Sequence, residues 1–323
     1  MRDFTYIQAS NPAEATAGLS GESRIIAGGT DILPLMKDDL ATPSTLIDIS
    51  RWREGREIRS TDSGLEIGAL VTLSEIASHH EIQVRYTALA EACRLSAAPQ
   101  LRNMGTIGGN LLQATRCWYY RGPYYCWLKG GERCYARHGE NELHSIFLTS
   151  PDESVCVSAH PSDPAVALLA FDATVRYTTP GGSAEVPLSQ FYRLPTSDRR
   201  TMIDIPTDAV ITSINIPAFA GKSVYRKAMS RATWTFALAS VALAILTEGD
   251  AIAEVRVAIG GVAPVPVRMS GVEQQMLGKL PSDLDSDELI RTLVQDARPL
   301  SQNGYKVMVL QGLFREALAA LNS

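Results

Sequence analysis

The sequence predicts an α+β fold in two domains, on the strength of two observations. Residues 1–217 alternate short apolar runs with glycine turns and capped helical stretches, which is typical of a mixed domain of strands and helices. After Pro217 the pattern changes to three strand-like runs, SVYRKAM, FALASVALAIL and AEVRVAIGGVA, followed by two amphipathic helical stretches. This order predicts an antiparallel sheet covered by helices. We therefore place a domain boundary near Ala218, which gives domains 1–217 and 218–323.

The first domain opens with a helix start and a strand–turn–helix unit. NPAE at residues 11–14 combines a side-chain cap, a first-turn proline and an acid near the positive helix end. The run RIIAGGTDILPLMK then predicts a buried strand over residues 24–27 and a tight turn at Gly28-Gly29. Thr30 or Asp31 is expected to cap the helix that follows.

Further capped helices and strands complete the first domain. STLIDIS and GLEIGALV predict strands, and Thr72 with Glu75 forms a capping-box pattern. A helix over residues 86–97 is expected to break at Pro99 into a glycine-rich loop, QLRNMGTIGGNLLQATR. Further on, AHPSDPAVALLAFDATVRYT predicts a helix capped by Ser162 and then a strand.

A segment with no clean periodicity separates these elements and contains four of the five cysteines. It is long for a structureless loop in a compact domain, and therefore needs an organiser. Four thiols are the number of ligands that an iron–sulfur cluster or a structural zinc ion needs, and their wide spacing is compatible with both. The third possibility is that the four thiols bind no metal. Cys93 stands apart in a helical stretch and is interpreted as a small buried hydrophobe. The four are Cys117, Cys126, Cys134 and Cys156.

Composition excludes several classes of function. The chain is 45% hydrophobic and 20% charged with a formal net charge of -5, and no Lys/Arg-rich run favours a nucleic-acid partner. No window approaches the ~20 apolar residues of a membrane helix, and MRDFTYIQAS lacks the features of a secretory signal. Paired carboxylates, a nucleophile elbow and an HExxH pattern are absent from the sequence. We therefore expect a soluble chain with no catalytic residue of its own.

Two glycine turns indicate a bound diphosphate. AGGTD at residues 27–31 and TIGGN at residues 106–110 would bring backbone N–H groups close to an anion without a lysine. Neither turn matches GxGxxG or a Walker loop, so ordinary turns remain the alternative for each one alone.

Four segments taken together resemble one known family over nearly the whole chain. IIAGGTDILPLMK, QLRNMGTIGGNLLQ, HPSDPAVALLAFDA and YRKAMSRATWTFALASVA occur in the order found in the FAD-binding (medium) subunit of the xanthine dehydrogenase and molybdenum aldehyde oxidoreductase family. The resemblance implies a two-part FAD-binding domain of the vanillyl-alcohol-oxidase/PCMH type, followed by the C-terminal antiparallel sheet with helices.

The cysteine-rich insert, residues 114–157, resembles that of two subgroups of the family. These are the FAD subunits of bacterial periplasmic aldehyde oxidoreductases and of 4-hydroxybenzoyl-CoA reductase, in which the insert binds a 4Fe-4S cluster. The gap between Cys117 and Cys126 is shorter than in the reductases, which favours the aldehyde oxidoreductase subgroup.

The resemblance also implies the residues at each cofactor. Cys117, Cys126, Cys134 and Cys156 match the cluster ligands. The matching FAD positions are Ile26, Ala27, Gly28, Gly29, Thr30, Asp31, Ile32, Leu33, Thr106, Ile107, Gly108, Gly109, Asn110, Thr115, Asp163 and Lys227.

The function implied by this resemblance is electron transfer inside a heterotrimer. A small subunit with 2Fe-2S clusters would pass electrons to FAD, while a large molybdenum-cofactor subunit would oxidise aldehydes to acids. The chain would stay in the cytoplasm, or reach the periplasm with a signal-bearing partner. Two alternatives remain: a 4-hydroxybenzoyl-CoA reductase-like subunit, and a zinc-stapled binding or scaffold module. The substrate, the external acceptor and the direction of electron flow are not encoded in the sequence.

Overall fold

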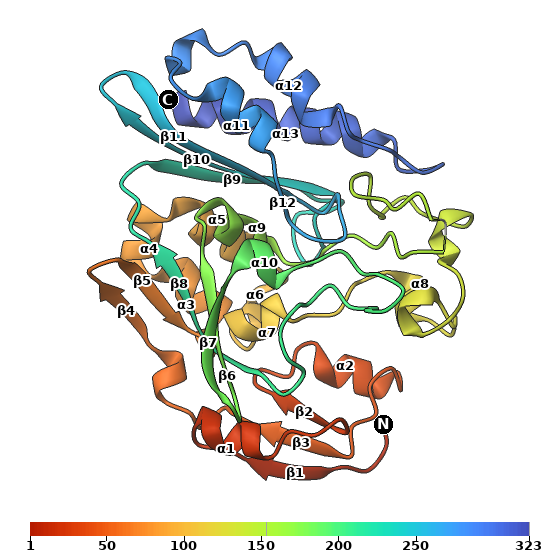
Figure 1. The fold of residues 1–323 in the computed structure, drawn as a ribbon. Helices are drawn as coiled ribbons and strands as arrows, with labels where there is room; N and C mark the ends of the chain where they lie inside the picture. Colours follow the sequence, from red (N-terminus) through yellow and green to blue (C-terminus); the bar gives the residue numbers. More distant parts are fainter. Residues whose placement is uncertain (153, 323) are drawn as a thin grey trace.

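A computed structural model describes residues 1–152 and 154–322, and within them the chain forms three sheets (Figure 1). Glu153 of the predicted insert and Ser323 of the predicted second domain lie outside the described residues. The mixed fold, with an antiparallel sheet and helices at the C-terminal end, confirms the predicted class.

The first sheet is parallel and is built from the N-terminal segment. Its strand order is β1-β3-β2, with β3 paired to both neighbours. The predicted cap is confirmed, because the Asn11 side chain accepts from the backbone N–H of Glu14 at 2.9 Å. The elements are β1 (Thr5–Gln8), α1 (Pro12–Ala17), β2 (Ser23–Ile26), α2 (Ile32–Lys37) and β3 (Thr45–Asp48).

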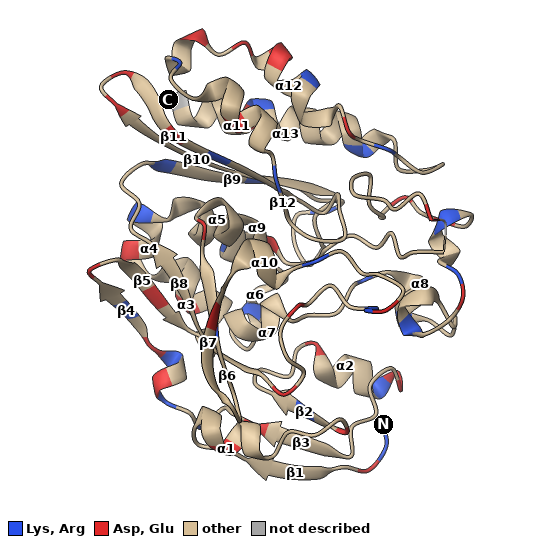
Figure 2. Cartoon of the chain, in the orientation of Figure 1, with Lys and Arg blue, Asp and Glu red and all other residues tan. Residues whose placement is uncertain are grey.

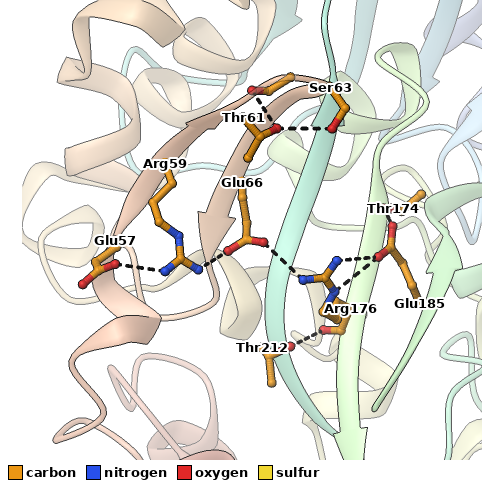
Figure 3. Close-up of polar contacts among 10 residues, drawn as sticks. Glu57, Arg59, Thr61, Ser63, Glu66, Thr174, Arg176, Glu185 and Thr212 are labelled. Carbon is orange, nitrogen blue, oxygen red and sulfur yellow. Dashed lines mark hydrogen bonds and ion pairs between the residues drawn. The ribbon is translucent and has the colours of Figure 1, made fainter.

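The second sheet is antiparallel and has the order β4-β5-β8-β6-β7. One of its faces presents a row of alternating charges, Glu57, Arg59, Glu66, Arg176 and Glu185, that crosses from strand to strand (Figure 3). Such exposed cross-strand pairs add little stability each but mark the solvent face. The strands are β4 (Ile58–Thr61), β5 (Gly64–Gly68), β6 (Thr174–Thr179), β7 (Gly182–Pro187) and β8 (Val210–Pro217).

Short helices pack with this sheet in one hydrophobic core, and two of them, α5 and α9, also contact the C-terminal sheet. The Thr72–Glu75 capping box is present in full, and the Ser162 side chain caps its helix, as predicted. The helices are η1 (Glu54–Arg56), α3 (Leu73–Ser78), α4 (His80–Arg85), α5 (Thr87–Leu95), α6 (Pro99–Arg102), α7 (Ile107–Leu111), α9 (Asp163–Ala170) and α10 (Leu188–Phe191).

The prediction of a loop beginning at Pro99 is wrong. Pro99 is the first residue of α6, where a missing N–H costs nothing, and Thr106 caps α7 by accepting from the Gly109 N–H at 3.2 Å. Helices of four and five residues are too short to produce a periodic pattern in the sequence.

The C-terminal sheet is antiparallel with the order β12-β11-β10-β9, and the three predicted strands and two predicted helices are confirmed. Gly249, in the turn between β10 and β11, has a φ of 60°. Helix α11 was not predicted from the sequence. The elements are β9 (Lys222–Ala228), β10 (Ala239–Glu248), β11 (Ala251–Gly260), β12 (Val267–Arg268), α11 (Ser270–Met276), η4 (Pro281–Asp283), α12 (Ser286–Val294) and α13 (Tyr305–Asn322).

Strand β10 is buried on both faces because it lies between the two halves of the chain. Large residues such as Val241 and Leu243 pack in one core with α11, α12 and α13. The small residues Ala242 and Ala244 belong to the other core. Helices α5 and α9 contact this sheet from that side (Figure 1). Small side chains let the helices approach the sheet closely, which joins the C-terminal half firmly to the first half.

The cysteine-rich insert forms an irregular lobe beside these layers (Figure 1). Its short helices are α8 (Trp118–Arg121), η2 (Trp127–Lys129) and η3 (Tyr135–Arg137). Lys and Arg positions are spread over the sheets, the helices and the lobe, interleaved with Asp and Glu (Figure 2). Within the part of the chain that the structure describes, no helix combines the length and apolar character needed to cross a membrane.

Candidate functional site

The first glycine turn, between β2 and α2, lies against the connection between α6 and α7. A Cβ atom on Gly28 would be 1.8 Å from the carbonyl oxygen of Met104, so only glycine fits there. Gly29 has a φ of 72°, in the left-handed region that favours glycine. The two predicted cofactor loops therefore touch each other directly, and each glycine of the first loop is required for a different reason.

This first loop offers a run of unpaired donors. Among the described residues, no acceptor is hydrogen-bonded to the backbone N–H groups of Gly28, Gly29, Thr30 or Asp31. All four residues are half-buried rather than enclosed. Consecutive free N–H groups of this kind form a concave site for an anion, and suit a diphosphate in particular.

The second loop uses most of its donors inside the protein. The N–H groups of Ile107 and Gly108 donate to the carbonyls of Val71 and Ala69, both at 2.9 Å. The side chain of Ile107 is fully buried in the core. Asn110 is different: its Oδ1 accepts from the Ser162 hydroxyl at 2.5 Å, which leaves its amide nitrogen as a donor. The second loop thus supports the first, and Asn110 is its main polar contribution.

Asp163 and Lys227 form an ion pair with each other, so their charged groups are not free to contact a cofactor. The Lys227 ammonium is 2.7 Å from the Asp163 carboxylate and also donates to the carbonyls of Leu95 and Thr235. Because these three bonds use all three N–H groups of Lys227, it has no donor left for a cofactor. The other oxygen of Asp163 accepts from the Tyr225 hydroxyl at 2.7 Å. The pair is buried between α9, β9 and the end of α5.

Asp31 turns its side chain away from the free N–H groups. Its carboxylate accepts from the backbone N–H of Ala114 at 2.8 Å and pairs with Arg116 and Arg121 at 2.8 and 2.9 Å. It is the N-terminal flanking residue of α2, as predicted, but its side chain does not cap that helix. Thr115 is buried nearby, and its hydroxyl accepts from the N–H of Cys117 at 3.2 Å.

The four cysteines of the insert lie in one lobe, three of them buried and Cys117 half-buried. The interaction between the Cys134 and Cys156 thiols lowers the pKa of Cys134 and raises the pKa of Cys156 well above its usual value. Burial raises the pKa of the Cys117 thiol to about 12. Cys117 packs with Tyr119 and Cys134 in one apolar cluster.

The metal site itself stays a prediction. In residues 1–152 and 154–322, no three His, Cys, Asp or Glu side chains converge on a position for a single metal ion. Cys93 is fully buried in α5, away from the lobe, as its interpretation as a small hydrophobe requires.

Comparisons with known proteins identify the family of the chain. A family model described as the FAD binding domain in molybdopterin dehydrogenase matches residues 2–219, and the model of the CO dehydrogenase flavoprotein C-terminal domain matches residues 224–321. The chain belongs to the FAD-binding medium subunits of the molybdenum aldehyde oxidoreductase and CO dehydrogenase family. Members of this family are oxidoreductase flavoproteins, and the predicted resemblance is confirmed.

Two relatives of this family match nearly the full length of the chain. The aldehyde oxidoreductase FAD-binding subunit of Escherichia coli (strain K12) is 36% identical over 329 residues, covering 99% of this chain and 98% of that one. The glyceraldehyde dehydrogenase medium chain of Sulfolobus acidocaldarius is 29% identical, covering 94% and 91%.

A solved structure of the family supports the same fold. A chain of carbon monoxide dehydrogenase from Hydrogenophaga pseudoflava superposes with a TM-score of 0.77 at 26% identity, covering 99% of this chain and 97% of that chain.

Two buried groups make contacts in or near the insert that the sequence does not indicate. His144 Nε2 is 3.2 Å from Cys117 Sγ, and burial lowers the pKa of the ring to about 4. Lys306 at the start of α13 is fully buried, and donates to the carbonyls of Leu143 and Gly261. Lone histidines and lysines carry no local sequence signal for such long-range contacts.

His160, which precedes Pro161 and the Ser162 cap, is expected to make the stability of the protein depend on pH. Its ring packs edge-on against Tyr192, and burial lowers its pKa to about 3. Because an unfolded histidine has a pKa of about 6.5, the folded state favours the neutral ring and full stability is present above that pH. Between pH 6.5 and 4.5 we expect this residue to cost roughly 2–3 kcal/mol of stability.

His160→Gln, which cannot titrate, should therefore flatten the fall in thermal stability below pH 6.5. His80→Gln, at an exposed position of α4, is the control and should keep the wild-type pH profile. An unchanged acid profile in His160→Gln would mean that the ring is not held neutral by burial.

Proposed function

We propose that this chain is the electron-transfer flavoprotein subunit of a heteromeric molybdenum hydroxylase that oxidises aldehydes to carboxylic acids. The observation that carries the proposal is the full-length identity of 36% to an aldehyde oxidoreductase FAD-binding subunit. In this role, a small 2Fe-2S subunit and a large molybdenum-cofactor subunit are its partners, and the substrate site lies on the large subunit. The domain division near Ala218 is part of the proposal, supported by the gap between the two family matches.

FAD fits the residues of the first loop, and we propose a specific mode of binding. The free N–H groups from Gly28 to Asp31 hold the diphosphate, because they supply donors and partial positive charge without a side chain. The amide nitrogen of Asn110 adds a donor from the second loop. Bound FAD supplies redox chemistry that connects one-electron and two-electron carriers.

In this proposal the buried pair of Asp163 and Lys227 does not contact the flavin and instead supports the residues around it. Its charges cancel, so the pair adds no net charge to the site. The Lys227 bond to the Thr235 carbonyl fixes the segment between β9 and β10. We therefore assign both residues a positioning role in place of the direct contact that the resemblance implied.

We further propose that Cys117, Cys126, Cys134 and Cys156 bind a 4Fe-4S cluster. Four thiols in one lobe suit this donor set, and the aromatic rings of Tyr119 and Trp127 pack around them and exclude water. The interaction with Cys156 lowers the pKa of Cys134, which favours the thiolate form that a metal ligand needs. A cluster bound here would carry electrons.

The first test is the cofactor content of the chain copurified with its partners under anaerobic conditions. We expect one FAD, four irons and four acid-labile sulfides per copy of this chain, beyond those assigned to the partners. Zinc in place of iron would mean that the insert binds a structural metal ion and carries no electrons. Absence of flavin from a folded chain would contradict the whole proposal.

The ligand assignment is tested by a pair of cysteine variants. Cys126→Ser should remove most of the iron and sulfide, because serine is a poor cluster ligand. Cys93→Ala is the matched control, since that thiol is buried in α5 outside the lobe, and it should retain full iron content. Equal iron loss in the two variants would point to a general folding defect and reject the assignment.

A further inference from the structure

The side chain of Asp31 joins the flavin loop to the cysteine lobe. Three donors meet its carboxylate, and all three come from the start of the insert: the Ala114 N–H, Arg116 and Arg121. The carboxylate is only 17% exposed and the Arg121 side chain 16%, so solvent screens this contact less than it would an exposed pair.

The direction of this side chain follows from electrostatics. The backbone N–H of Asp31 is one of the free donors of the first loop, and an unpaired carboxylate beside those donors would repel a bound anion. Pairing with two arginines neutralises the carboxylate. The same residue therefore presents its main chain to the anion site and its side chain to the insert.

Arg121 connects this contact to a cysteine. It is the last residue of α8, which begins directly after Cys117, and its N–H donates to the Cys117 carbonyl at 2.9 Å. Its guanidinium also donates to the carbonyls of Thr115 and Ala114, at 2.9 and 3.2 Å. Movement of Asp31 would therefore be transmitted to the helix that follows Cys117.

Arg116 extends the network to the C-terminal half of the chain. Its guanidinium lies 4.8 Å from the ring centre of Phe236, in the segment between β9 and β10. Lys227 holds the neighbouring residue of that segment through the Thr235 carbonyl. Arg116 thus links the Asp31 carboxylate indirectly to a third part of the chain.

We propose that Asp31 is a positioning residue that locks the flavin loop to the Cys117 helix, so that the flavin site and the cysteine site form one unit. The inference rests on the proposed function for the identity of the two cofactors, but the coupling itself is a property of the chain. In this arrangement a change on either side alters both sites.

The test uses the full chain, with one variant on each side of the contact. Asp31→Asn keeps an acceptor for the Ala114 N–H but removes the charge, and Arg121→Gln removes the partner from the insert. The readouts are the dissociation constant of FAD, the iron content, and the rate at which iodoacetamide labels Cys117 in chain grown under iron limitation. Asp38→Asn, an exposed carboxylate just past α2, is the matched control.

Each of the two variants should weaken FAD binding about tenfold, the scale of one charged hydrogen bond, and should also lower iron content and speed the labelling of Cys117. The double variant should be no worse than Asp31→Asn alone, because Asp31→Asn already removes the ion pair with Arg121. Asp38→Asn should match the wild type in all three readouts.

The inference is overturned if Asp31→Asn affects FAD alone while Arg121→Gln affects iron and labelling alone, or if the two effects simply add. Failure of the cluster proposal is separate: a wild-type chain without iron would reject the cluster, while the FAD and labelling readouts would still decide the coupling.

Discussion

Replacing Gly28 by alanine is expected to weaken FAD binding by at least about 100-fold, or about 2.8 kcal/mol. The new Cβ would lie 1.8 Å from the Met104 carbonyl oxygen, a distance that no real contact reaches, so the two cofactor loops must separate. Because the obstacle is backbone rather than a flexible side chain, rotamer changes cannot relieve it. Flavin absorbance of the purified variant and titration of the FAD-free protein with FAD provide the measurement.

Two further glycine variants separate this clash from a general loss of stability. Gly29→Ala forces a side chain into the left-handed region and should weaken binding less, by about 1–2 kcal/mol. At Gly21, in the same domain, a Cβ would meet nothing within 4 Å, so Gly21→Ala should bind FAD as the wild type does. A normal flavin content in Gly28→Ala would refute the placement of the diphosphate at this loop.

The parts of the fold that were predictable depend on local interactions. The Thr72–Glu75 box and the Ser162 cap each involve residues within three positions of one another, so the sequence contains the whole interaction. The long strands of the C-terminal sheet carried enough apolar residues to be recognised. By contrast, α6 and α7 are too short for their sequence pattern to be distinguished from that of a glycine-rich loop.

The details of the candidate site could not be predicted because its contacts join distant segments. The resemblance placed Asp31 and Asp163 near the cofactor, yet the direction of each side chain depends on partners 90 and 64 positions away. The same reason explains why His144 beside Cys117 and Lys306 beneath the insert were not assigned to the site. Resemblance to family segments indicates which loops form a site, whereas the partners of each side chain can be identified only from the three-dimensional structure.

The buried pair of Lys227 and Asp163 leads to the second large expected effect. Lys227→Met should destabilise the chain by about 3–5 kcal/mol, because it leaves the Asp163 carboxylate buried without its cation. The Lys227 side chain is fully buried, so water cannot replace the lost ammonium. Thermal unfolding followed by circular dichroism measures the loss, and FAD binding below the transition reports whether the loop held through Thr235 is disturbed as well.

An exposed ion pair and a double variant serve as controls for the effect of Lys227→Met. Arg315 and Asp287 pair at 2.9 Å on the surface, where both side chains are more than half exposed, so Arg315→Met should not measurably change the melting temperature. Adding Asp163→Asn to Lys227→Met should recover part of the lost stability, since it removes the stranded charge. If the double variant is instead less stable than Lys227→Met alone, the cost lies in the lost hydrogen bonds to Leu95 and Thr235, and the charge argument for this pair is wrong.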